Sequence, residues 1–240
     1  MNVSSATIDV QSSNYLIEAS DVVYDFGETP ALRGANLSIR EGEILAVMGP
    51  SGSGKSTLLH CLAGILTPKD GEIRFSGQRI DTLDENKRSA LRRDAFGFVF
   101  QFGQLVPELT AEENVALPLL LGGLRRNEAL GRTREWFERL GLSGLERRRS
   151  GELSGGQAQR VALARGLVAH PKVLFADEPT GSLDSMTGEL VMELLVTAAH
   201  QDGTTVVLVT HEPRVAAYAG REVIVRDGLV SSLVSDAPAP

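Results

Sequence analysis

The residues with the clearest chemical potential form a glycine-rich loop. The loop carries the pattern G-x-x-x-x-G-K-[ST], in which glycines let successive backbone N–H groups turn toward one anion. Lys55 is placed to reach the β- and γ-phosphates of a nucleotide, and the Ser56 hydroxyl is placed to hold Mg²⁺. The predicted nucleotide-binding residues of this loop are Gly49, Pro50, Ser51, Gly52, Ser53, Gly54, Lys55, Ser56 and Thr57.

The segments on either side of the loop support this prediction. Residues 43–48 form a short apolar stretch typical of a buried strand, and residues 58–63 have the character of a helix. A helix that begins at Lys55 adds about half a positive charge at its N-terminus, which favours a phosphate there. The alternative is a turn rich in glycine and serine, but such a turn does not require lysine and serine at these positions.

Two adjacent carboxylates lie at the end of a second apolar segment. Residues 172–177 predict a strand buried on both faces, and Asp177 and Glu178 lie at its end. Because ligands bind at the carboxyl ends of parallel strands, we expect Asp177 to hold the metal directly or through water. Glu178 would then lie near the γ-phosphate, where a carboxylate can orient or deprotonate an attacking water. The alternative, a solvated turn before Pro179, fits poorly with so apolar a strand.

A third segment, residues 153–157, reads Leu-Ser-Gly-Gly-Gln before an amphipathic stretch. Ser154 fits the N-cap of a helix, and Gly155 and Gly156 leave backbone N–H groups open. With Gln157, these residues predict a second helix start that binds an anion. An ordinary capped helix explains the segment equally well by itself, and the neighbouring phosphate loop favours the anion site.

Four further residues are candidates for the same site, and it is their joint presence that supports a functional role for each. Gln101 ends an apolar strand, where its amide could reach the metal or the water, and Asp184 lies in a tight polar loop. His211 follows another strand and could bond a γ-phosphate, and Tyr24 could stack on a base. Each has a plain alternative as a surface glutamine, a helix-capping aspartate, a satisfied histidine or a core tyrosine.

Composition limits the class of protein. The chain has 240 residues, of which 42% are hydrophobic and 23% charged, as in a globular protein. Its net charge of −7 disfavours nucleic acid, which needs a basic surface. Cys61 cannot form an internal disulfide and is expected to be buried. No signal peptide is evident, and the longest apolar run, residues 115–121, is too short to span a bilayer.

The pattern along the chain predicts an α/β protein with distinct parts. Residues 1–14 and 236–240 are expected to be disordered, and alternation over residues 15–39 predicts antiparallel strands. Residues 71–75 and 96–100 predict further strands. Residues 103–165 predict a helical subdomain, in which Thr110 and Glu113 form a capping box.

The second half predicts a parallel crossover and a hairpin. Residues 204–210 predict a strand that follows the one ending at Asp177, and a helix separates the two. Residues 222–226 predict a last strand, which turns at Asp227 and pairs antiparallel with residues 229–233. The predicted apolar stripe of the intervening helix is Leu190, Val191, Leu194, Leu195 and Ala198.

Taken together, these motifs resemble those of ABC transporter ATP-binding subunits, over residues 16–230. Residues 49–56 match the Walker A loop and residues 173–177 the Walker B strand. Residues 153–157 match the signature motif, which is the specific element because phosphate loops alone occur in many NTPases. The other matches are the Q-loop at Gln101, the D-loop at 182–184, the switch histidine at His211 and the adenine-stacking aromatic at Tyr24.

The resemblance implies a fold, a cofactor and an assembly. It implies an α/β P-loop NTPase over residues 15–235, with a mixed parallel core sheet, an N-terminal antiparallel β part and the helical subdomain. Two copies, or a copy and a close paralogue, would enclose Mg²⁺ and ATP head to tail between the loop of one and the Ser154 segment of the other. The implied catalytic residues are Glu178, His211, Gln101 and Asp184, and the implied metal ligands are Ser56, Gln101 and Asp177.

Four segments narrow the resemblance to one branch of the family. They resemble ATPases of lipoprotein release, macrolide efflux, haem efflux and peptide-antibiotic resistance, and they are residues 65–71, 91–101, 109–115 and 176–184. That branch implies a permease with an extracytoplasmic domain, and a place on the cytoplasmic face of the bacterial inner membrane. One departure lies at residues 102–105, Phe-Gly-Gln-Leu, where the branch often has a second Gln and an Asn.

Other classes of protein also carry such a phosphate loop and are alternatives to a transporter subunit. A regulatory ABC ATPase of the cell-division or antibiotic-sensing type would carry identical motifs and differ only in its partner. A soluble ABC ATPase acting on DNA or ribosomes usually has coiled-coil insertions or two cassettes, and the chain shows neither. A third alternative is a small GTPase or kinase. A GTPase should show Asn-Lys-x-Asp, but residues 86–89 read Asn-Lys-Arg-Ser.

Overall fold

The computed structural model describes residues 15–232, so the predicted disordered ends and residue 233 of the predicted hairpin lie outside the described residues. The strands are β1 (Tyr15–Phe26), β2 (Thr29–Arg40), β3 (Ile44–Met48), β4 (Asp70–Phe75), β5 (Gln78–Arg79), β6 (Phe96–Phe100), β7 (Val173–Asp177), β8 (Thr205–Val209), β9 (Arg221–Arg226) and β10 (Leu229–Ser232). The helices are α1 (Lys55–Leu62), α2 (Glu85–Ala95), α3 (Ala111–Leu121), α4 (Arg126–Arg139), α5 (Gly155–Leu167), α6 (Ser185–Asp202) and α7 (Pro213–Ala216), with a 3-10 turn at Ser150–Glu152.

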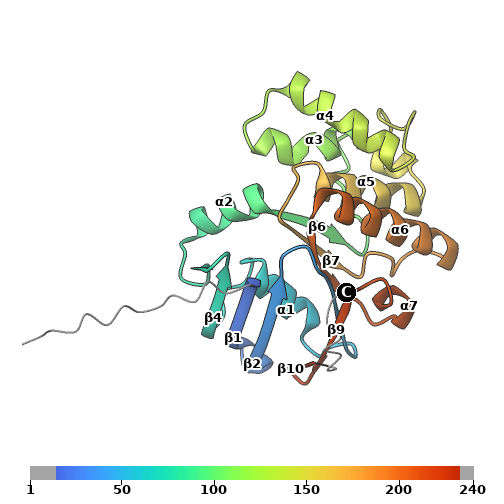
Figure 1. Ribbon diagram of the computed structural model, residues 1–240. Helices are drawn as coiled ribbons and strands as arrows, with labels where there is room; N and C mark the ends of the chain where they lie inside the picture. Colours follow the sequence, from blue (N-terminus) through green and yellow to red (C-terminus); the bar gives the residue numbers. More distant parts are fainter. Residues whose placement is uncertain (1–14, 233–240) are drawn as a thin grey trace, which may run out of the picture.

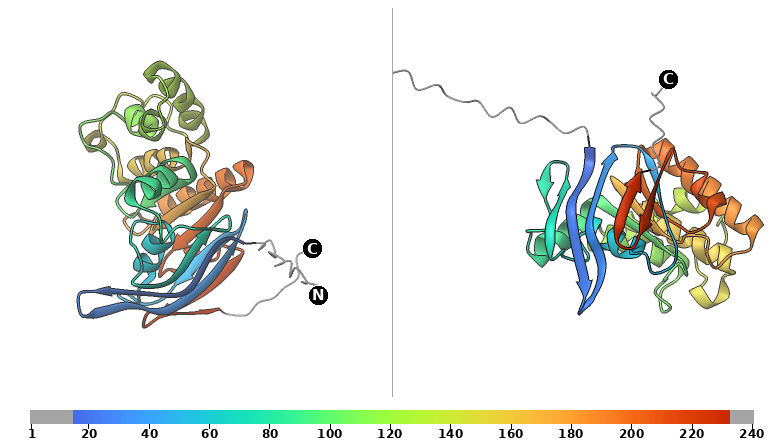
Figure 2. Two further views of the ribbon diagram at one scale, coloured as in Figure 1. Left: turned by 90° about the vertical axis from the view of Figure 1, so that its left-hand side faces the viewer. Right: turned by 90° about the horizontal axis from the view of Figure 1, so that it is seen from below.

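Two sheets organise these elements. The larger has the order β10-β9-β3-β8-β7-β6, in which all neighbours are parallel except β10, which pairs antiparallel with β9. The smaller is antiparallel, with the order β2-β1-β4-β5. Helices α3, α4 and α5 lie at the opposite end of the molecule from the β1–β2 hairpin (Figures 1 and 2). The predicted α/β fold with a mixed core sheet and an N-terminal antiparallel part is confirmed.

The central strands are buried on both faces, as their continuous apolar runs predicted. On β7, Val173 and Phe175 point to a core shared with α1 and the small sheet. Leu174 and Ala176 point the other way, to a core shared with α3, α5 and α6. This alternation follows from the two-residue period of a strand, so a single five-residue strand joins both cores.

Helix α1 lies between the two sheets and anchors the end of the phosphate loop. Leu58, Leu59 and Leu62 are fully buried in the core shared by both sheets. Cys61 is buried on the same helix, and its burial raises the pKa of the thiol to about 12. The prediction that Cys61 is a buried apolar side chain is confirmed.

Helices α3, α4 and α5 occupy most of residues 103–165, where a helical subdomain was predicted. α3 packs against both α4 and α5, and the latter also packs on β6 and α6. The predicted capping box of Thr110 and Glu113 starts α3 and is confirmed. The boundaries of this subdomain stay a prediction. Within the described residues, no helix is both long and apolar enough to cross a membrane.

One prediction for α6 is wrong. Val191, Leu195 and Ala198 are buried and Leu194 is partly buried, but Leu190 is 44% exposed. The buried face is set by the three-to-four residue spacing from Val191 through Ala198. Leu190 precedes Val191 by one residue, so it is turned by about 100° from that face onto the solvent side.

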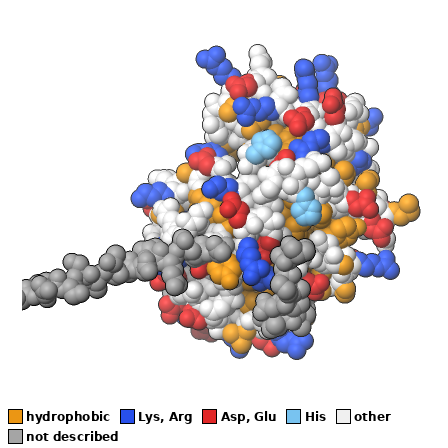
Figure 3. Space-filling model, in the orientation of Figure 1, with side chains coloured by type: hydrophobic (Ala, Val, Ile, Leu, Met, Phe, Trp, Pro, Cys, Tyr) orange, Lys and Arg blue, Asp and Glu red, His pale blue; other side chains and the backbone are white. Residues whose placement is uncertain are grey.

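The surface mixes charges of both signs. On the face shown in Figure 3, Lys and Arg side chains stand beside Asp and Glu side chains, and several basic ones project from the end formed by α3 and α4. Helix α2, which was not predicted from the sequence, contributes a cluster in which Glu85 pairs with Arg88 and Arg92. These pairs hold the pKa of the Glu85 carboxyl at about 2.

Candidate nucleotide-binding site

The phosphate loop joins β3 to α1 and is enclosed by backbone from two other elements. Gly49 has a φ of +147°, and a Cβ on it would overlap the carbonyl oxygen of Val225 in β9. Gly54 has a φ of +106°, and a Cβ there would lie 2.5 Å from the carbonyl oxygen of Ala31 in β2. Neither position tolerates a side chain, because backbone cannot move aside as a flexible side chain can. The loop is therefore held between β2 and the β9–β10 hairpin.

Lys55 lies inside the loop. Its Nζ donates hydrogen bonds of 2.9 Å to the carbonyl oxygens of Gly49 and Pro50, and the residue is only 7% exposed. An ammonium group so buried has a high cost unless it is hydrogen-bonded or meets an anion. The structure thus places one positive charge at the centre of the curled backbone, as the sequence predicted for a phosphate site.

Two observations show that the loop fits a phosphate group. Ser53 Oγ is buried and has no hydrogen-bond partner among the described residues. Helix α1 has Gly54 at its N-cap and no side-chain cap, whereas α2, α3, α5 and α6 each have one. The N–H groups of a first helical turn need acceptors, and a phosphate supplies them. The donor set of this loop therefore suits a polyphosphate.

Three parallel strands place the other predicted site residues at one edge of the large sheet. The last residues of β6, β7 and β8 stand side by side, with Phe100 paired to Asp177 and Asp177 paired to Val209. Residues that directly follow these ends must emerge at the same edge. The candidates that do so are Gln101, Glu178 and, two residues after its strand, His211.

Asp177 meets the phosphate loop at this edge. Its Oδ1 accepts a hydrogen bond of 3.2 Å from the hydroxyl of Ser56. Burial raises the pKa of the Asp177 carboxyl, because the charged form loses water contacts, and the Ser56 hydrogen bond opposes this rise. A carboxylate and a hydroxyl oxygen are ligands that Mg²⁺ accepts, and a cation would offset the desolvation of Asp177. These two residues fit a magnesium site.

Glu178 and His211 form a pair beside Asp177. His211 Nδ1 lies 2.8 Å from Glu178 Oε1, and the Glu178 side chain is only 18% exposed. Glu178 also has a φ of +49°, a left-handed conformation that side-chain-bearing residues rarely adopt. Its N–H donates to Val209 O at 2.9 Å, which helps hold this backbone in place. Strain of this kind clusters at functional sites.

Gln101 contacts the segment that follows Glu178. The hydroxyl of Ser182 donates to the carbonyl oxygen of Gln101 at 2.8 Å, and a Cβ on Gly181 would lie 2.9 Å from Gln101 Nε2. Asp184 lies three residues beyond Gly181 and caps α6, with its carboxylate accepting from the N–H of Thr187 at 3.1 Å. Hydrogen bonds from the Thr187 hydroxyl, at 2.7 Å, and from the Thr187 N–H lower the pKa of the Asp184 carboxyl. Asp184 thus caps a helix, which was the predicted alternative to a role in the nucleotide site.

Tyr24 lies near the phosphate loop rather than within it. It pairs across the β1–β2 hairpin with Leu32, whose Cδ2 would lie 3.3 Å from a Cβ on Gly54. The Tyr24 ring is half-buried and lies 5.0 Å from the ring of Phe26, edge to face. This position suits a base next to the loop, and base stacking by Tyr24 stays a prediction.

The segment of Ser154 does not join this group within one chain. Ser154 caps α5 by accepting from the N–H of Gln157 at 3.3 Å, and Gln157 returns a 2.9 Å bond to the N–H of Ser154. The cap is therefore the predicted one, and Gly155 is the first residue of the helix. α5 packs against α3, α4, α6 and β6, whereas α1 packs against β1, β2, β7 and β8. The two helix starts belong to different parts of the molecule.

Sequence reasoning missed the residues that tie α5 to the Gln101 segment. Arg165 donates to the carbonyl oxygens of Gly103 at 2.7 Å and Gln104 at 2.9 Å. Gln159 Nε2 donates to the carbonyl oxygen of Phe100 at 2.9 Å. Each bond joins residues about sixty positions apart, and no local pattern in the sequence signals such a pairing. Through them, α5 holds the backbone on both sides of Gln101.

Comparisons with known proteins agree with this geometry. A family model described as ABC transporter matches residues 32–181. The lipoprotein-releasing system ATP-binding protein LolD of Geobacter metallireducens is 45% identical over 219 residues, which cover 90% of this chain and 97% of that protein. The macrolide export ATP-binding/permease protein MacB of Marinobacter nauticus is 44% identical over 228 residues, and the chain spans 35% of its length.

Solved structures lead to the same class. A dimeric structure of the ATP-binding cassette MJ0796, in a post-hydrolysis state with ADP and Pi, has a TM-score of 0.82 and 40% identity, and the match covers 91% of this chain and 99% of that one. A second dimeric structure of MJ0796 has the same TM-score and 41% identity. The chain belongs to the ABC transporter family, as an ATP-binding cassette that hydrolyses ATP.

Proposed function

We propose that this chain is the ATPase subunit of a bacterial export or mechanotransmission system, in which two cassettes close on ATP and act on a separate permease with an extracytoplasmic domain. It would then work at the cytoplasmic face of the inner membrane, held there by the permease. The support is its likeness to LolD over 97% of that protein. The likeness to MacB adds to it, since the name of that protein joins ATP-binding and permease functions.

Residues 49–57 would hold the phosphates of ATP. Lys55 and the uncapped N-terminus of α1 supply positive charge and N–H donors, and the buried Ser53 hydroxyl supplies one more donor. Ser56 and Asp177 would hold Mg²⁺, with Gln101 as a third ligand from the neighbouring strand end. When bound, Mg²⁺ neutralises charge that develops on the phosphates.

Glu178 would act as the base. Its carboxylate lies at the sheet edge next to Asp177, where it can accept a proton from a water that attacks the γ-phosphate. His211 holds one oxygen of that carboxylate through Nδ1, so it orients the base, and its ring could also contact the phosphate. Asp184 serves as a positioning residue, because its cap fixes the start of α6 beside the Gln101 contact.

Ser154 would complete the site from a second copy. Its Oγ accepts from Gln157 within α5, but a hydroxyl also carries one proton to donate. That proton, with the N–H groups of Gly155 and Gly156, can bind a phosphate presented by another chain. Two such chains related by a twofold axis bury two ATP molecules between them. The observation that carries the proposal is this division of one phosphate site between α1 and α5, which lie in separate parts of the chain.

Glu178→Gln tests the proposal. The amide cannot accept the proton, so ATP binding should remain while turnover falls about a hundredfold or more. Light scattering should show monomers without nucleotide and dimers with Mg²⁺ and ATP. A matched control is Glu212→Gln, because a Glu212 carboxylate oxygen lies within 4.8 Å of Glu178 and His211 but makes no hydrogen bond to His211 among the described residues. Near-parental turnover by Glu178→Gln would remove Glu178 from this role, and a monomer with ATP bound would remove the dimer.

The permease partner is tested separately. Co-purification of the tagged chain from membranes should recover an integral membrane protein with an extracytoplasmic domain, and mass spectrometry would identify it. Recovery of a soluble partner, or of ribosomes, would contradict the proposal while leaving the ATPase assignment in place.

A further inference from the structure

The segment that carries Gln101 is not held in place by an apolar core. Phe102 is 72% exposed, and Gln104 is exposed as well. Gly103 and Gln104 both have a left-handed backbone, with φ angles of +66° and +46°. Glycine adopts this conformation freely, whereas glutamine rarely does. Since side-chain burial does not fix this part of the chain, other contacts must do so.

Hydrogen bonds to backbone carbonyls fix this segment instead. Each carbonyl oxygen of residues 100–104 accepts at least one. N–H groups of the segment itself supply two of these bonds, and Gln159 and Ser182 supply one each. Arg165 supplies two more, at consecutive carbonyl oxygens. The far end of the segment therefore depends on a single side chain of α5.

The Arg165 guanidinium has no carboxylate to neutralise it. Within residues 15–232 its hydrogen bonds go to the carbonyl oxygens of Gly103 and Gln104, and it forms no ion pair. Burial lowers the pKa of this group, because the charged form loses water contacts. A planar guanidinium holds its N–H donors in a rigid fork, so it can fix two neighbouring carbonyls in one orientation. These contacts suit a residue that positions backbone.

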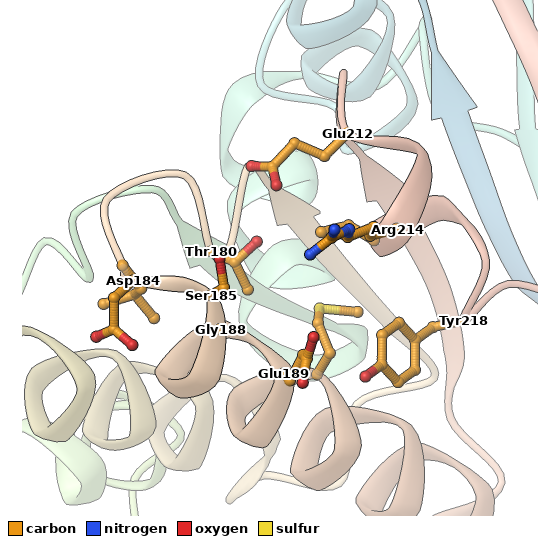
Figure 4. A pocket seen from close by; sticks show the side chains of 11 residues that line it. Thr180, Asp184, Ser185, Gly188, Glu189, Glu212, Arg214 and Tyr218 are labelled. Carbon is orange, nitrogen blue, oxygen red and sulfur yellow. The ribbon is translucent and has the colours of Figure 1, made fainter.

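The two outside anchors of the segment differ in what supports them. Ser182 is exposed, and its loop borders a cavity of about 230 Å³ between the start of α6 and α7 (Figure 4). Thr180 and Asp184, on either side of Ser182, line that cavity. The segment lies directly on α5, by contrast, since a Cβ on Gly103 would be 3.3 Å from a backbone oxygen of that helix. Arg165 therefore anchors the segment to the more closely packed element.

We propose that Arg165 is a positioning residue for Mg²⁺. By holding two carbonyls on α5, it keeps the Gln101 amide at the sheet edge, where Gln101 would act as the third ligand beside Ser56 and Asp177. Groups that orient metal ligands from outside the coordination sphere change metal affinity or activity about 10- to 100-fold when they are removed. This inference rests on the magnesium site of the proposed function and adds to it a residue from α5.

The Mg²⁺ requirement of hydrolysis tests the proposal. Arg165→Met keeps an unbranched stem but removes the fork, so the free Mg²⁺ concentration for half-maximal ATP hydrolysis should rise about tenfold. Arg165→Lys keeps the charge and should give a smaller rise, and it replaces Arg165→Met if that variant is too unstable to purify. The matched control is Arg160→Met, which removes another α5 guanidinium, bonded to the carbonyl oxygens of Leu140 at 2.9 Å and Gly141 at 3.1 Å. The control should keep the parental Mg²⁺ requirement.

Amide hydrogen exchange gives a readout without metal or nucleotide. The N–H groups of Gly103 and Gln104 donate to carbonyl oxygens of their own segment. Their exchange should be about tenfold faster in Arg165→Met, because the segment opens locally once its far end is released. Arg160→Met should exchange like the parent. Parental exchange in Arg165→Met would overturn the positioning role.

A double-mutant cycle separates the positioning of Gln101 from a general loss of stability. Gln101→Ala alone should raise the Mg²⁺ requirement, and adding Arg165→Met should raise it no further, because the ligand is already absent. A further rise in the double variant, or a parental requirement in Arg165→Met, overturns this inference and leaves the proposed function intact. A parental requirement in Gln101→Ala removes Gln101 from the proposed metal site, and this inference falls with it.

Discussion

Two helices of this chain, α1 and α5, start beside glycine and serine. They differ in whether a side chain of their own helix already accepts hydrogen bonds from the N–H groups of the first turn. α1 has no side-chain cap, contains Lys55 and is backed by β2 and the β9–β10 hairpin. α5 is capped by Ser154 and Gln157, and Ser154 itself is exposed. α1 therefore offers a phosphate site that its own chain encloses. α5 offers only a hydroxyl proton and a few N–H groups at the surface, which suit a ligand held by another molecule.

The two N-termini therefore divide the residues that bind nucleotide from those that pair two copies. Changes around α1 should remove nucleotide from an isolated chain. Changes at the start of α5 should leave that binding intact and act only when two copies meet.

The largest effect is expected from removing Mg²⁺. Chelation with EDTA should lower ATP hydrolysis about a thousandfold, because metal ions contribute several kcal/mol to such transfers. Asp177→Asn should lower hydrolysis in Mg²⁺ by a similar factor, since an amide is a weaker ligand for a hard cation. Phosphate release with and without added Mg²⁺ measures this. Full activity in EDTA would contradict the place given to Ser56 and Asp177.

Lys55→Ala should lower the affinity of the monomer for ATP about a hundredfold, because bonds to charged groups contribute about 1.5–3 kcal/mol each. Calorimetric titration with nucleotide measures the loss. The control is Lys69→Ala, which removes an exposed lysine paired with Asp25 at 2.7 Å and should leave affinity unchanged. Retention of parental affinity by Lys55→Ala would show that the buried ammonium does not bind phosphate.

Ser154→Asp should lower ATP hydrolysis about thirtyfold while monomer affinity for ATP stays at the parental level. Aspartate still caps a helix, so α5 keeps its start, but its carboxylate repels a phosphate held by the second copy. Titration and phosphate release on the same preparation separate the two effects. A parallel fall in monomer affinity would place Ser154 in the site of its own chain.

The smallest effect separates capping from ligand binding. Ser154→Ala and Thr110→Ala each remove a capping box of the same type, from α5 and α3. Each should lower the free energy of unfolding by about 1 kcal/mol, measured by urea denaturation. Only Ser154→Ala should also lower hydrolysis. Equal hydrolysis by the two variants would mean that Ser154 acts as a cap alone.

Much of the fold could be predicted because its signals are local. The glycine pattern of the loop, the apolar run before Asp177 and the capping box at Thr110 each depend on residues close in sequence. The structure describes these elements where they were expected. The assignment of Leu190 failed because apolar residues on neighbouring positions of a helix cannot all lie on one face.

The unpredicted features are contacts between residues far apart in the chain. The enclosure of Gly49 by Val225 and the bonds of Arg165 to Gly103 and Gln104 join segments that only the folded sheet brings together. Helix α2 was missed because its composition is strongly polar, and only Ala95 of that helix is buried. Glu178 and His211 were each predicted to follow a strand, but the 2.8 Å contact between them was not predicted.

A mixing experiment tests the shared site most directly. Lys55→Ala and Ser154→Asp should each hydrolyse ATP poorly alone, because every site in either homodimer has one damaged half. Mixed dimers combine both damaged halves in one site and leave the other site intact. An equimolar mixture should recover roughly a quarter of parental hydrolysis, since about half of the dimers are mixed and each has one intact site. Activity no greater than that of the separate variants would contradict a phosphate site divided between two chains.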